Sequence, residues 1–405
     1  MTTDLVLTTV PLDGFDPATI LDAGGDEPRG FFADDTSVTA WRGAARVHTA
    51  DDLASLKGAP IPEGARAFVV SRFARDPRDA RDPAWAGTPG ALWVLPRCAV
   101  TARGGVTTAQ WLLPRGTAVP ALPRAPSAPR EARAHAEPTD PAPWHALVTE
   151  ALDAMRGGAL QKVVAARRVC LTRDGGWSPS RLLDAMRAHA APGTVRFAVG
   201  WGDALFLGAT PETLIAREGR ALRTEALAGS LPRDPARDDI DRDALLASEK
   251  DRREHALVAE MIRETLAPWC EAIRAPDAPA VRSLRALHHL WTPFAATLRD
   301  DAPDALAMAA ALHPTPAVAG LPVRDAVAWL GAHEPSPRGW FAGAVGWCDA
   351  RGDGRFAVAI RSAVLRGERA WVYAGAGLVP GSDPAREWQE TAVKMGLMRA
   401  ILGAP

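Results

Sequence analysis

Short runs in which apolar and polar residues alternate occupy residues 29–114 and predict β-strands. Four segments carry this pattern, namely GFFADDTSVTAW, ARAFVVSRF, GALWVLPRCAVTA and GVTTAQWLL. They are rich in β-branched and aromatic residues and are bounded by Gly, Pro or Asp, which is typical of strands joined by turns. We therefore expect a strand-rich N-terminal part, in which no motif carries obvious chemistry.

The next stretch, residues 115–143, is rich in Pro, Ala and Arg and predicts an irregular surface connection. Such a connection could separate two domains or bridge two parts of one. We favour the second interpretation, because the strands before it are too few to close a core of their own. The expected organisation is a single domain over residues 1–405, with its largest part in residues 144–402.

From residue 144 onward, helix-like and strand-like patterns follow one another. Helices are predicted near 144–156, 179–190, 241–269, 303–312, 323–331 and 384–402. Strands are predicted at 161–171, 194–202, 204–210, 213–219, 339–349, 355–367 and 369–379. Strands that cluster with helices between them predict an α+β fold with large, mostly antiparallel sheets flanked by helices.

Composition excludes several classes of protein. The formal net charge is −1, and Arg is interleaved with Asp throughout the 405 residues, so a mixed solvated surface is expected rather than a nucleic-acid or membrane partner. Cys98, Cys170, Cys270 and Cys348 form no CxxC pair, which argues against a disulfide framework or a zinc site. The N-terminus has no signal-peptide pattern, and no apolar run approaches the ~20 residues of a membrane span. We expect a cytoplasmic protein.

Acidic residues on apolar helix faces are the most informative local signal. In the predicted helix 241–269, Glu254 lies on the stripe formed by five apolar residues: Leu246, Leu257, Val258, Met261 and Leu266. In the last helix, Glu387, Glu390 and Lys394 share a face with Leu397 and Ile401. A carboxylate that faces inward must be paired, protonated or bound to a metal.

Two interpretations of these acids stay open at this point. The first is structural: Glu254 pairs with Lys250 or Arg253, and Glu390 pairs with Lys394, as exposed neighbours. The second is functional, because two inward carboxylates from separate helices suit a hard, oxygen-preferring cation such as Mg²⁺.

Four further positions carry weaker signals. Lys162 falls on one face of its predicted strand, where a desolvated lysine could act as a general base, although a lysine that protects a sheet edge is the alternative. Glu212, which follows Thr-Pro at a turn, is unremarkable by itself. Gly375 and Gly377 could let the backbone approach a ligand closely.

Taken together and in order, nine blocks resemble the chorismate-utilising enzymes. The blocks are LQKVV, GATPETL, ALAGSLPR, LLASEKDRREHALV, HHLWTPF, LHPTPAVAG, FAGAVGWCD, IRSAVL and YAGAGLVPGSDPAREWQETAVK. This family includes isochorismate synthases, salicylate synthases, anthranilate synthase large subunits and aminodeoxychorismate synthases. The resemblance covers roughly residues 144–402 and implies the anthranilate-synthase-type chorismate-binding fold.

Within the family, the resemblance favours an isochorismate synthase. Members that use water as the nucleophile carry a lysine at the position of Lys162, because water needs a base and ammonia does not. Aminodeoxychorismate synthases carry a nucleophilic lysine where Ala228 stands. The segments HPTPAVAG and LWTPF are similar to those of isochorismate synthases, whereas salicylate synthases differ at both.

The resemblance also implies roles for individual residues. Lys162 would be the base that activates water, and Glu212 the acid that protonates the departing hydroxyl. Glu254 and Glu390 would hold Mg²⁺, with Asp251 and Glu387 as outer-shell carboxylates. The remaining positions match substrate contacts: Gly229, Ser230, His289, Ala317, Val318, Arg361, Gly375 and Lys394.

Three alternatives remain beside this interpretation. A salicylate synthase would go on to eliminate pyruvate, an ammonia-dependent synthase would need a glutaminase partner, and a chorismate sensor or scaffold would have no catalysis. The resemblance implies chorismate as the substrate, a product that feeds siderophore or menaquinone synthesis, no glutaminase subunit and a monomer.

Overall fold

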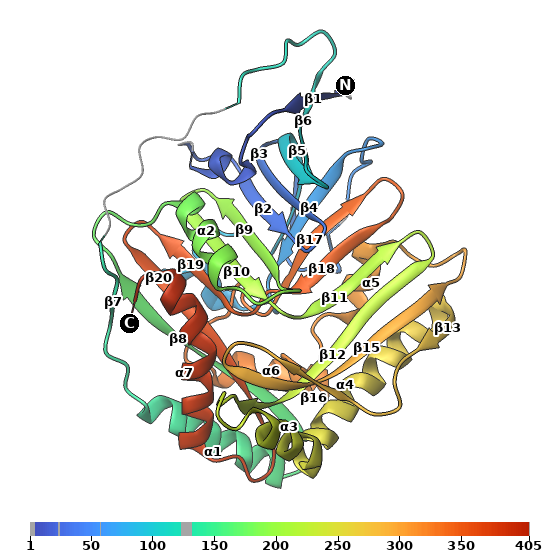
Figure 1. Cartoon of the computed structure of the whole chain (residues 1–405). Coiled ribbons are helices and arrows are strands. Elements are labelled where there is room, and N and C mark those ends of the chain that lie inside the picture. The colour runs from blue at the N-terminus through green and yellow to red at the C-terminus, as the bar shows by residue number, and fades with distance from the viewer. Residues whose placement is uncertain (1–4, 23–24, 57, 123–131, 405) are drawn as a thin grey trace.

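The computed structural model describes residues 5–22, 25–56, 58–122 and 132–404 (Figure 1). Every strand pairing within these residues is antiparallel, as the α+β prediction requires. The pairings branch at strand β5 (Ala91–Arg103), which contacts β3 (Ser37–Ala50), β4 (Arg66–Ser71) and β6 (Val106–Pro114). Strand β1 (Leu5–Leu12) extends the sheet beyond β6.

The first arm of the sheet leaves β5 through β3. Its strands are, in spatial order, β2 (Arg29–Ala33), β9 (Val195–Trp201), β10 (Ala204–Thr210), β19 (Ser362–Arg366), β20 (Arg369–Leu378) and β8 (Lys162–Thr172). Strand β8 also pairs with two short strands, β7 (His135–Ala136) and β16 (Gly320–Leu321).

The second arm leaves β5 through β4. Its strands are, in spatial order, β17 (Ala344–Asp349), β18 (Gly354–Val358), β11 (Thr213–Glu218), β12 (Ala221–Pro232) and β15 (Leu287–Leu298). Strands β13 (Cys270–Arg274) and β14 (Ala280–Ser283) pair with β15. The two arms lie on either side of the molecule in Figure 1.

Helices cover both arms. Three of them pack with the first arm: α1 (Ala142–Arg156), α2 (Pro179–His189) and α7 (Pro384–Ile401). Two pack on the second arm: α3 (Asp238–Ala247) and α4 (Glu249–Leu266). Helix α5 (Ala305–Leu312) contacts β11 and β18, and α6 (Val323–His333) contacts β8 and β16.

The N-terminal strands share a core with the rest of the chain. The side chains of Trp41, Trp85 and Trp93 are fully buried in the same cluster as residues from both arms. The indole Nε1 of Trp85 donates a hydrogen bond to the hydroxyl of Tyr373 on β20 at 2.8 Å. The N-terminal part therefore contributes side chains directly to the hydrophobic core that it shares with both arms. Of the predicted irregular connection, residues 123–131 lie outside the described residues.

The prediction of one long helix over 241–269 was wrong in one respect, because the helix is interrupted at Ser248, which separates α3 from α4. Ser248 has extended backbone angles, and its hydroxyl accepts a hydrogen bond from the Asp251 N–H, so it caps α4. Leu246 consequently belongs to α3, where it is 37% exposed, and cannot share a stripe with Glu254. The buried face of α4 consists of His255, Val258, Ile262 and Leu266.

The structure also differs from the strand prediction at several places, two of which bear on the cavity. The predicted strand 355–367 is split into β18 and β19, since Arg361 adopts a left-handed backbone with φ of 52°. Strand β12 was missed, because it contains a bulge at Gly229, whose φ is 78°. Glycine interrupts the alternation of apolar and polar residues there and hides the strand pattern.

Candidate active site

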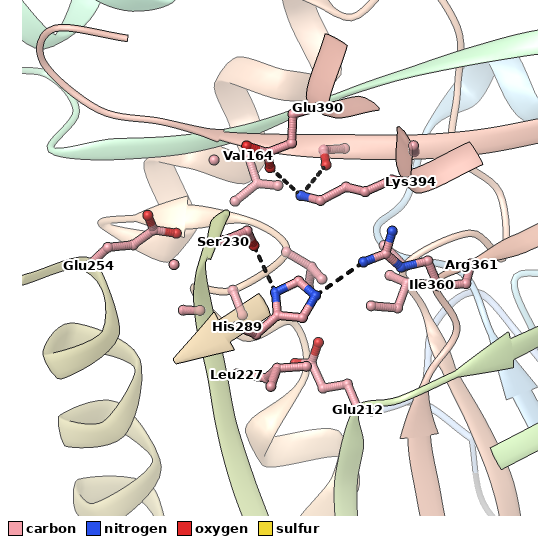
Figure 2. A pocket seen from close by; sticks show the side chains of 18 of the residues that line it. Val164, Glu212, Leu227, Ser230, Glu254, His289, Ile360, Arg361, Glu390 and Lys394 are labelled. Atoms are coloured by element: carbon pink, nitrogen blue, oxygen red, sulfur yellow. Dashed lines mark hydrogen bonds and ion pairs between the residues drawn. The ribbon is translucent and has the colours of Figure 1, made fainter. Parts of the chain in front are cut away.

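A cavity lies between the two arms, and nearly all of the candidate residues line it (Figure 2). Strands β8 and β20 contribute from the first arm, β12 and β15 contribute from the second, and helices α4 and α7 add their acidic faces. The lining includes thirteen predicted positions: Glu212, Gly229, Ser230, Asp251, Glu254, His289, Ala317, Val318, Arg361, Gly375, Glu387, Glu390 and Lys394. Lys162 is not part of this lining.

Two of the points at which the chain crosses between the arms carry a candidate residue each. Glu212 lies between β10 of the first arm and β11 of the second, and Arg361 lies between β18 of the second and β19 of the first. The two crossings are joined by backbone hydrogen bonds, from Val358 N to Glu212 O and from Ala209 N to Arg361 O, each of 3.1 Å. This arrangement fixes both residues relative to both walls.

Glu212 is buried, with 5% of its surface exposed. Burial and the nearby carboxylate of Glu225 raise the pKa of Glu212 to about 8, against the opposing charges of Lys162, Arg361 and Lys394. Glu212 therefore carries a proton at neutral pH. A protonated carboxyl on a cavity wall can donate that proton to a leaving group.

Lys162 lies at the start of β8 with 1% of its surface exposed, and its Nζ is 2.8 Å from Glu254 Oε1. The backbone of Lys162 pairs with Leu321 of β16, and the next residue, Val163, pairs with a strand on each side. Lys162 therefore does not lie on an exposed edge of the sheet. A side chain at Gly377 would place its Cβ 2.9 Å from Glu254 Oε1 and 3.5 Å from Lys162 Cε. The glycine thus makes room for this ion pair beside the cavity.

The Lys162 contact decides the state of Glu254. Burial alone would raise the pKa of the Glu254 carboxyl, but the ammonium group of Lys162 brings it below its ordinary value. The structural alternative from the sequence is therefore wrong for Glu254, whose partner comes from a strand of the opposite arm. For Glu390 the predicted pairing is present, since its Oε1 is 2.5 Å from Nζ of Lys394, but both side chains are largely buried and line the cavity instead of lying exposed.

Four carboxyl groups gather at one end of the cavity, which we call the carboxylate end: Asp251, Glu254, Glu387 and Glu390. Burial and the neighbouring carboxylates raise the pKa of Asp251. Burial, followed by the charge of Glu390, raises the pKa of Glu387 to about 7. Negative charge is thus under-compensated here, and a bound cation would relieve it.

The donor set at the carboxylate end fits Mg²⁺. Within the described residues, no three His, Cys, Asp or Glu side chains are already arranged around one point as a metal site. Mg²⁺ commonly uses one or two protein carboxylates together with water and substrate oxygens, and the oxygen-only donors of Glu254 and Glu390 meet this requirement. A cation there would share Glu254 with Lys162.

His289 lies between Glu254 and Arg361 in Figure 2 and connects β12 to the crossing that carries Arg361. Its Nδ1 is 2.7 Å from Ser230 Oγ, and its Nε2 is 3.4 Å from Nη2 of Arg361 (Figure 2). Burial and the charge of Arg361 hold the pKa of His289 well below its usual value, so the ring is neutral. Because a guanidinium only donates, Nε2 must accept and Nδ1–H must donate to Ser230. His289 thereby orients Arg361.

Two small residues shape the remaining wall. Ala228 lines the cavity where the resemblance places a nucleophilic lysine in aminodeoxychorismate synthases, so no amine is present at that point. The next residue, Gly229, has a positive φ, and a Cβ there would lie 3.0 Å from Asp251 Cβ. This close packing brings β12 against the start of α4.

Sequence reasoning missed a buried ion pair whose arginine, Arg338, lines the cavity. Arg338 donates to both carboxylate oxygens of Glu334, at 2.9 and 2.6 Å, and to the carbonyl oxygens of Val318 and Val164 at 2.8 and 2.5 Å. Glu334 in turn accepts from Ala166 N–H at 2.7 Å. The pair fixes the strand that carries Lys162. Glu334 and Arg338 are only four residues apart, but their contacts with Val318, Val164 and Ala166 come from distant parts of the sequence, which no local pattern could indicate.

Comparison with known proteins agrees with this arrangement. Residues 47–403 match the family model described as chorismate binding enzyme. The chain belongs to the chorismate-binding enzyme family. Every candidate residue from Lys162 to Lys394 lies inside the region that matches this family.

Relatives within the chorismate-binding enzyme family are named isochorismate synthases. The salicylate biosynthesis isochorismate synthase of Pseudomonas aeruginosa is 42% identical over 285 residues, which cover 69% of this chain and 59% of the relative. The isochorismate synthase EntC of Escherichia coli K12 is 39% identical over 248 residues, covering 60% of this chain and 63% of the relative. The match therefore spans about three fifths of the length of these curated relatives.

Solved structures extend the similarity to the whole chain. The menaquinone-specific isochorismate synthase MenF from Escherichia coli has a TM-score of 0.82 and 27% sequence identity, and the match covers 99% of this chain and 95% of that one. The fold expected from the family resemblance is confirmed. Among the described residues, no helix has both the length and the apolar character needed to cross a membrane.

Proposed function

We propose that this chorismate-binding enzyme is an isochorismate synthase, which converts chorismate to isochorismate. The observation that carries the proposal is the protonated Glu212 on a cavity that also adjoins a buried lysine, Lys162. One site thus offers an acid and a candidate base, the two groups that exchange of a hydroxyl for water requires. Figure 2 shows Glu212 and Glu254, the partner of Lys162, on either side of His289.

The reaction balances with water as its only co-reactant. Lys162 accepts a proton from a water molecule as the water oxygen bonds to C2 of the ring. The ring double bonds shift, and the bond between C4 and its hydroxyl breaks. Glu212 donates its proton to that hydroxyl, which leaves as water. Lys162 must first loosen its contact with Glu254 and release the proton of its ammonium group to solvent, because the carboxylate favours the charged amine. After turnover, solvent takes the new proton from Lys162 and returns one to Glu212, which restores both groups.

The carboxylate end would hold Mg²⁺ through Glu254 and Glu390, with Asp251 and Glu387 accepting hydrogen bonds from its water ligands. When bound, this cation would supply positive charge that draws electron density from the ring through the ring carboxylate. The charge of Lys394, which contacts Glu390 at 2.5 Å and Gly375 O at 3.0 Å, would remain available to the substrate.

The second carboxylate of chorismate, on its pyruvyl group, would bind at Arg361. The guanidinium is oriented by His289 and lies at the opposite end of the cavity from Glu254 in Figure 2. Its planar fork suits a carboxylate, which it can contact through two donors. The dianionic substrate would thus lie between a cation at one end and an arginine at the other.

The wider setting follows from the same proposal. Since water is the nucleophile, no glutaminase subunit is needed, and the protein would work as a monomer in the cytoplasm. Its product would feed siderophore synthesis through 2,3-dihydroxybenzoate, or menaquinone synthesis.

The direct test is to incubate the purified protein with chorismate and Mg²⁺ and to identify the products by chromatography and mass spectrometry. We expect isochorismate, and its loss when EDTA is added. Salicylate with pyruvate would overturn the assignment in favour of a salicylate synthase. Bound but unconverted chorismate would contradict any catalytic role.

A further inference from the structure

The turn that carries Glu212 is held from outside the cavity. Nη1 of Arg282 donates to the carbonyl oxygen of Pro211 at 3.1 Å, and the N–H of Thr213 donates to Oε1 of Glu225 at 2.7 Å. The residues immediately before and after Glu212 are therefore tied to two side chains that form an ion pair with each other. That pair is Arg282 Nη1 and Glu225 Oε2, at 2.9 Å.

Glu225 is held in place by a third donor. Its Oε2 also accepts a hydrogen bond from Nε1 of Trp291 at 2.6 Å, and its side chain is only 10% exposed. Trp291 belongs to the LWTPF segment on β15, yet it does not line the cavity. The LWTPF segment thus has a structural role, because the indole of Trp291 fixes the Glu225 carboxylate that supports the Glu212 turn.

The charge of Glu225 also acts on Glu212. The titratable and charged groups around Glu212 come from six places: Glu225 on β12, Arg282 on β14, Lys162 on β8, Lys394 on α7, Arg361 between β18 and β19, and the neutral His289 on β15. Burial is the largest cause of the raised pKa of Glu212, Glu225 adds to it, and Lys162, Arg361 and Lys394 oppose it. Without Glu225, the pKa of Glu212 would therefore lie lower.

We propose that Glu225, fixed by Arg282 and Trp291, is a positioning residue that keeps the Glu212 side chain in place and in its protonated form. The inference rests on the proposed function, in which Glu212 is the proton donor. Glu225 does not touch the substrate and acts only through the turn and through its charge.

The test compares Glu225→Gln, which removes the charge, with Glu225→Asp, which keeps it. The matched control is Glu218→Gln, an exposed glutamate on the neighbouring strand β11. The first measurement is kcat at saturating chorismate across pH. For Glu225→Gln we expect the high-pH limb of the profile to move down by about one unit, the effect of losing one nearby charge. Glu225→Asp should leave the high-pH limb where it is, because the negative charge is kept. It should lower kcat, because the shorter side chain loses the hydrogen bond from the Thr213 N–H.

A purely structural role would lower kcat at every pH and leave the limb in place, and that result would overturn the proposal. An equal shift in Glu218→Gln would do the same. If Glu225→Gln does not fold because Arg282 is left unpaired, the double variant Glu225→Gln/Arg282→Met replaces both partners. Because it removes a cation together with the anion, it should show a smaller downward shift, and an unchanged limb would overturn the proposal.

A second measurement does not depend on activity. The infrared band of the protonated Glu212 carboxyl can be assigned by its loss in Glu212→Gln and then followed across pH without substrate. The midpoint should be lower in Glu225→Gln than in the unchanged protein, and equal midpoints would overturn the inference. A protein that makes no isochorismate would refute the proposed function, while this titration would still decide the role of Glu225.

Discussion

Glu254 and Glu212 are two glutamates beside one cavity, and their pKa values move in opposite directions. Both lose water on folding, which by itself raises the pKa of a carboxyl group. Glu254 meets the ammonium group of Lys162 at 2.8 Å, and its pKa falls. Burial, reinforced by the charge of Glu225, raises the pKa of Glu212 to about 8. The charge beside each carboxyl group decides whether burial prevails, and it assigns one glutamate to hold positive charge and the other to deliver a proton.

The largest effect on turnover should come from removing the ammonium group that pairs with Glu254. Lys162→Ala should lower kcat by roughly 10²- to 10⁴-fold, the range for loss of a general base, while chorismate still binds. The measurement is steady-state turnover together with calorimetric titration of chorismate. Turnover equal to that of the unchanged protein would exclude Lys162 as the base.

The next effect concerns stability on the Glu212 side. The folded protein keeps the Glu212 proton up to about pH 8, whereas the unfolded chain releases it near the ordinary value of 4.5. The contribution of Glu212 to the free energy of unfolding is therefore fully present below pH 4.5 and is lost as the pH rises through about 8. The expected loss between pH 6 and pH 8.5 is about 3 kcal/mol. Glu212→Gln should lack this loss.

Urea unfolding at both pH values measures the difference between the two proteins. The same decline in the Glu212→Gln variant would show that Glu212 is not the group that keeps its proton.

The smallest effect should come from crowding the Lys162–Glu254 pair without changing any charge. Gly377→Ala places a methyl group 2.9 Å from Glu254 Oε1, so the pair must shift, and we expect kcat to fall several-fold through the displaced carboxylate. The matched control is Gly396→Ala, which meets nothing within 4 Å and should stabilise α7 by about 0.5–1 kcal/mol. Equal activity in both variants would mean that the pair tolerates displacement.

Much of this site could be predicted from the sequence, for reasons that differ between residues. Glu387, Glu390 and Lys394 were placed on an inward helix face because helical spacing is a local property, and the structure agrees. Glu254 was placed inward by a partly wrong argument, since the stripe that included Leu246 ended at Ser248. The family resemblance, rather than spacing, identified Lys162 and Glu212.

Long-range partners could not be predicted. Glu225 and Arg282 are 57 positions apart, and Arg338 contacts Val164 across 174 positions. No periodicity within one element encodes such pairs, because they depend on how the two arms come together. The Lys162–Glu254 contact is of the same kind, and the sequence offered only nearby basic residues as partners.

Both arms branch from β5, a strand of the N-terminal part that contributes no residue to the cavity. The two arms are therefore joined through a segment whose own sequence carries no recognisable chemistry. We expect substitutions in that segment to be tolerated as long as strand register and the buried tryptophans persist. A shortened chain that begins at residue 144 would keep every reactive group and lose the spacing between them.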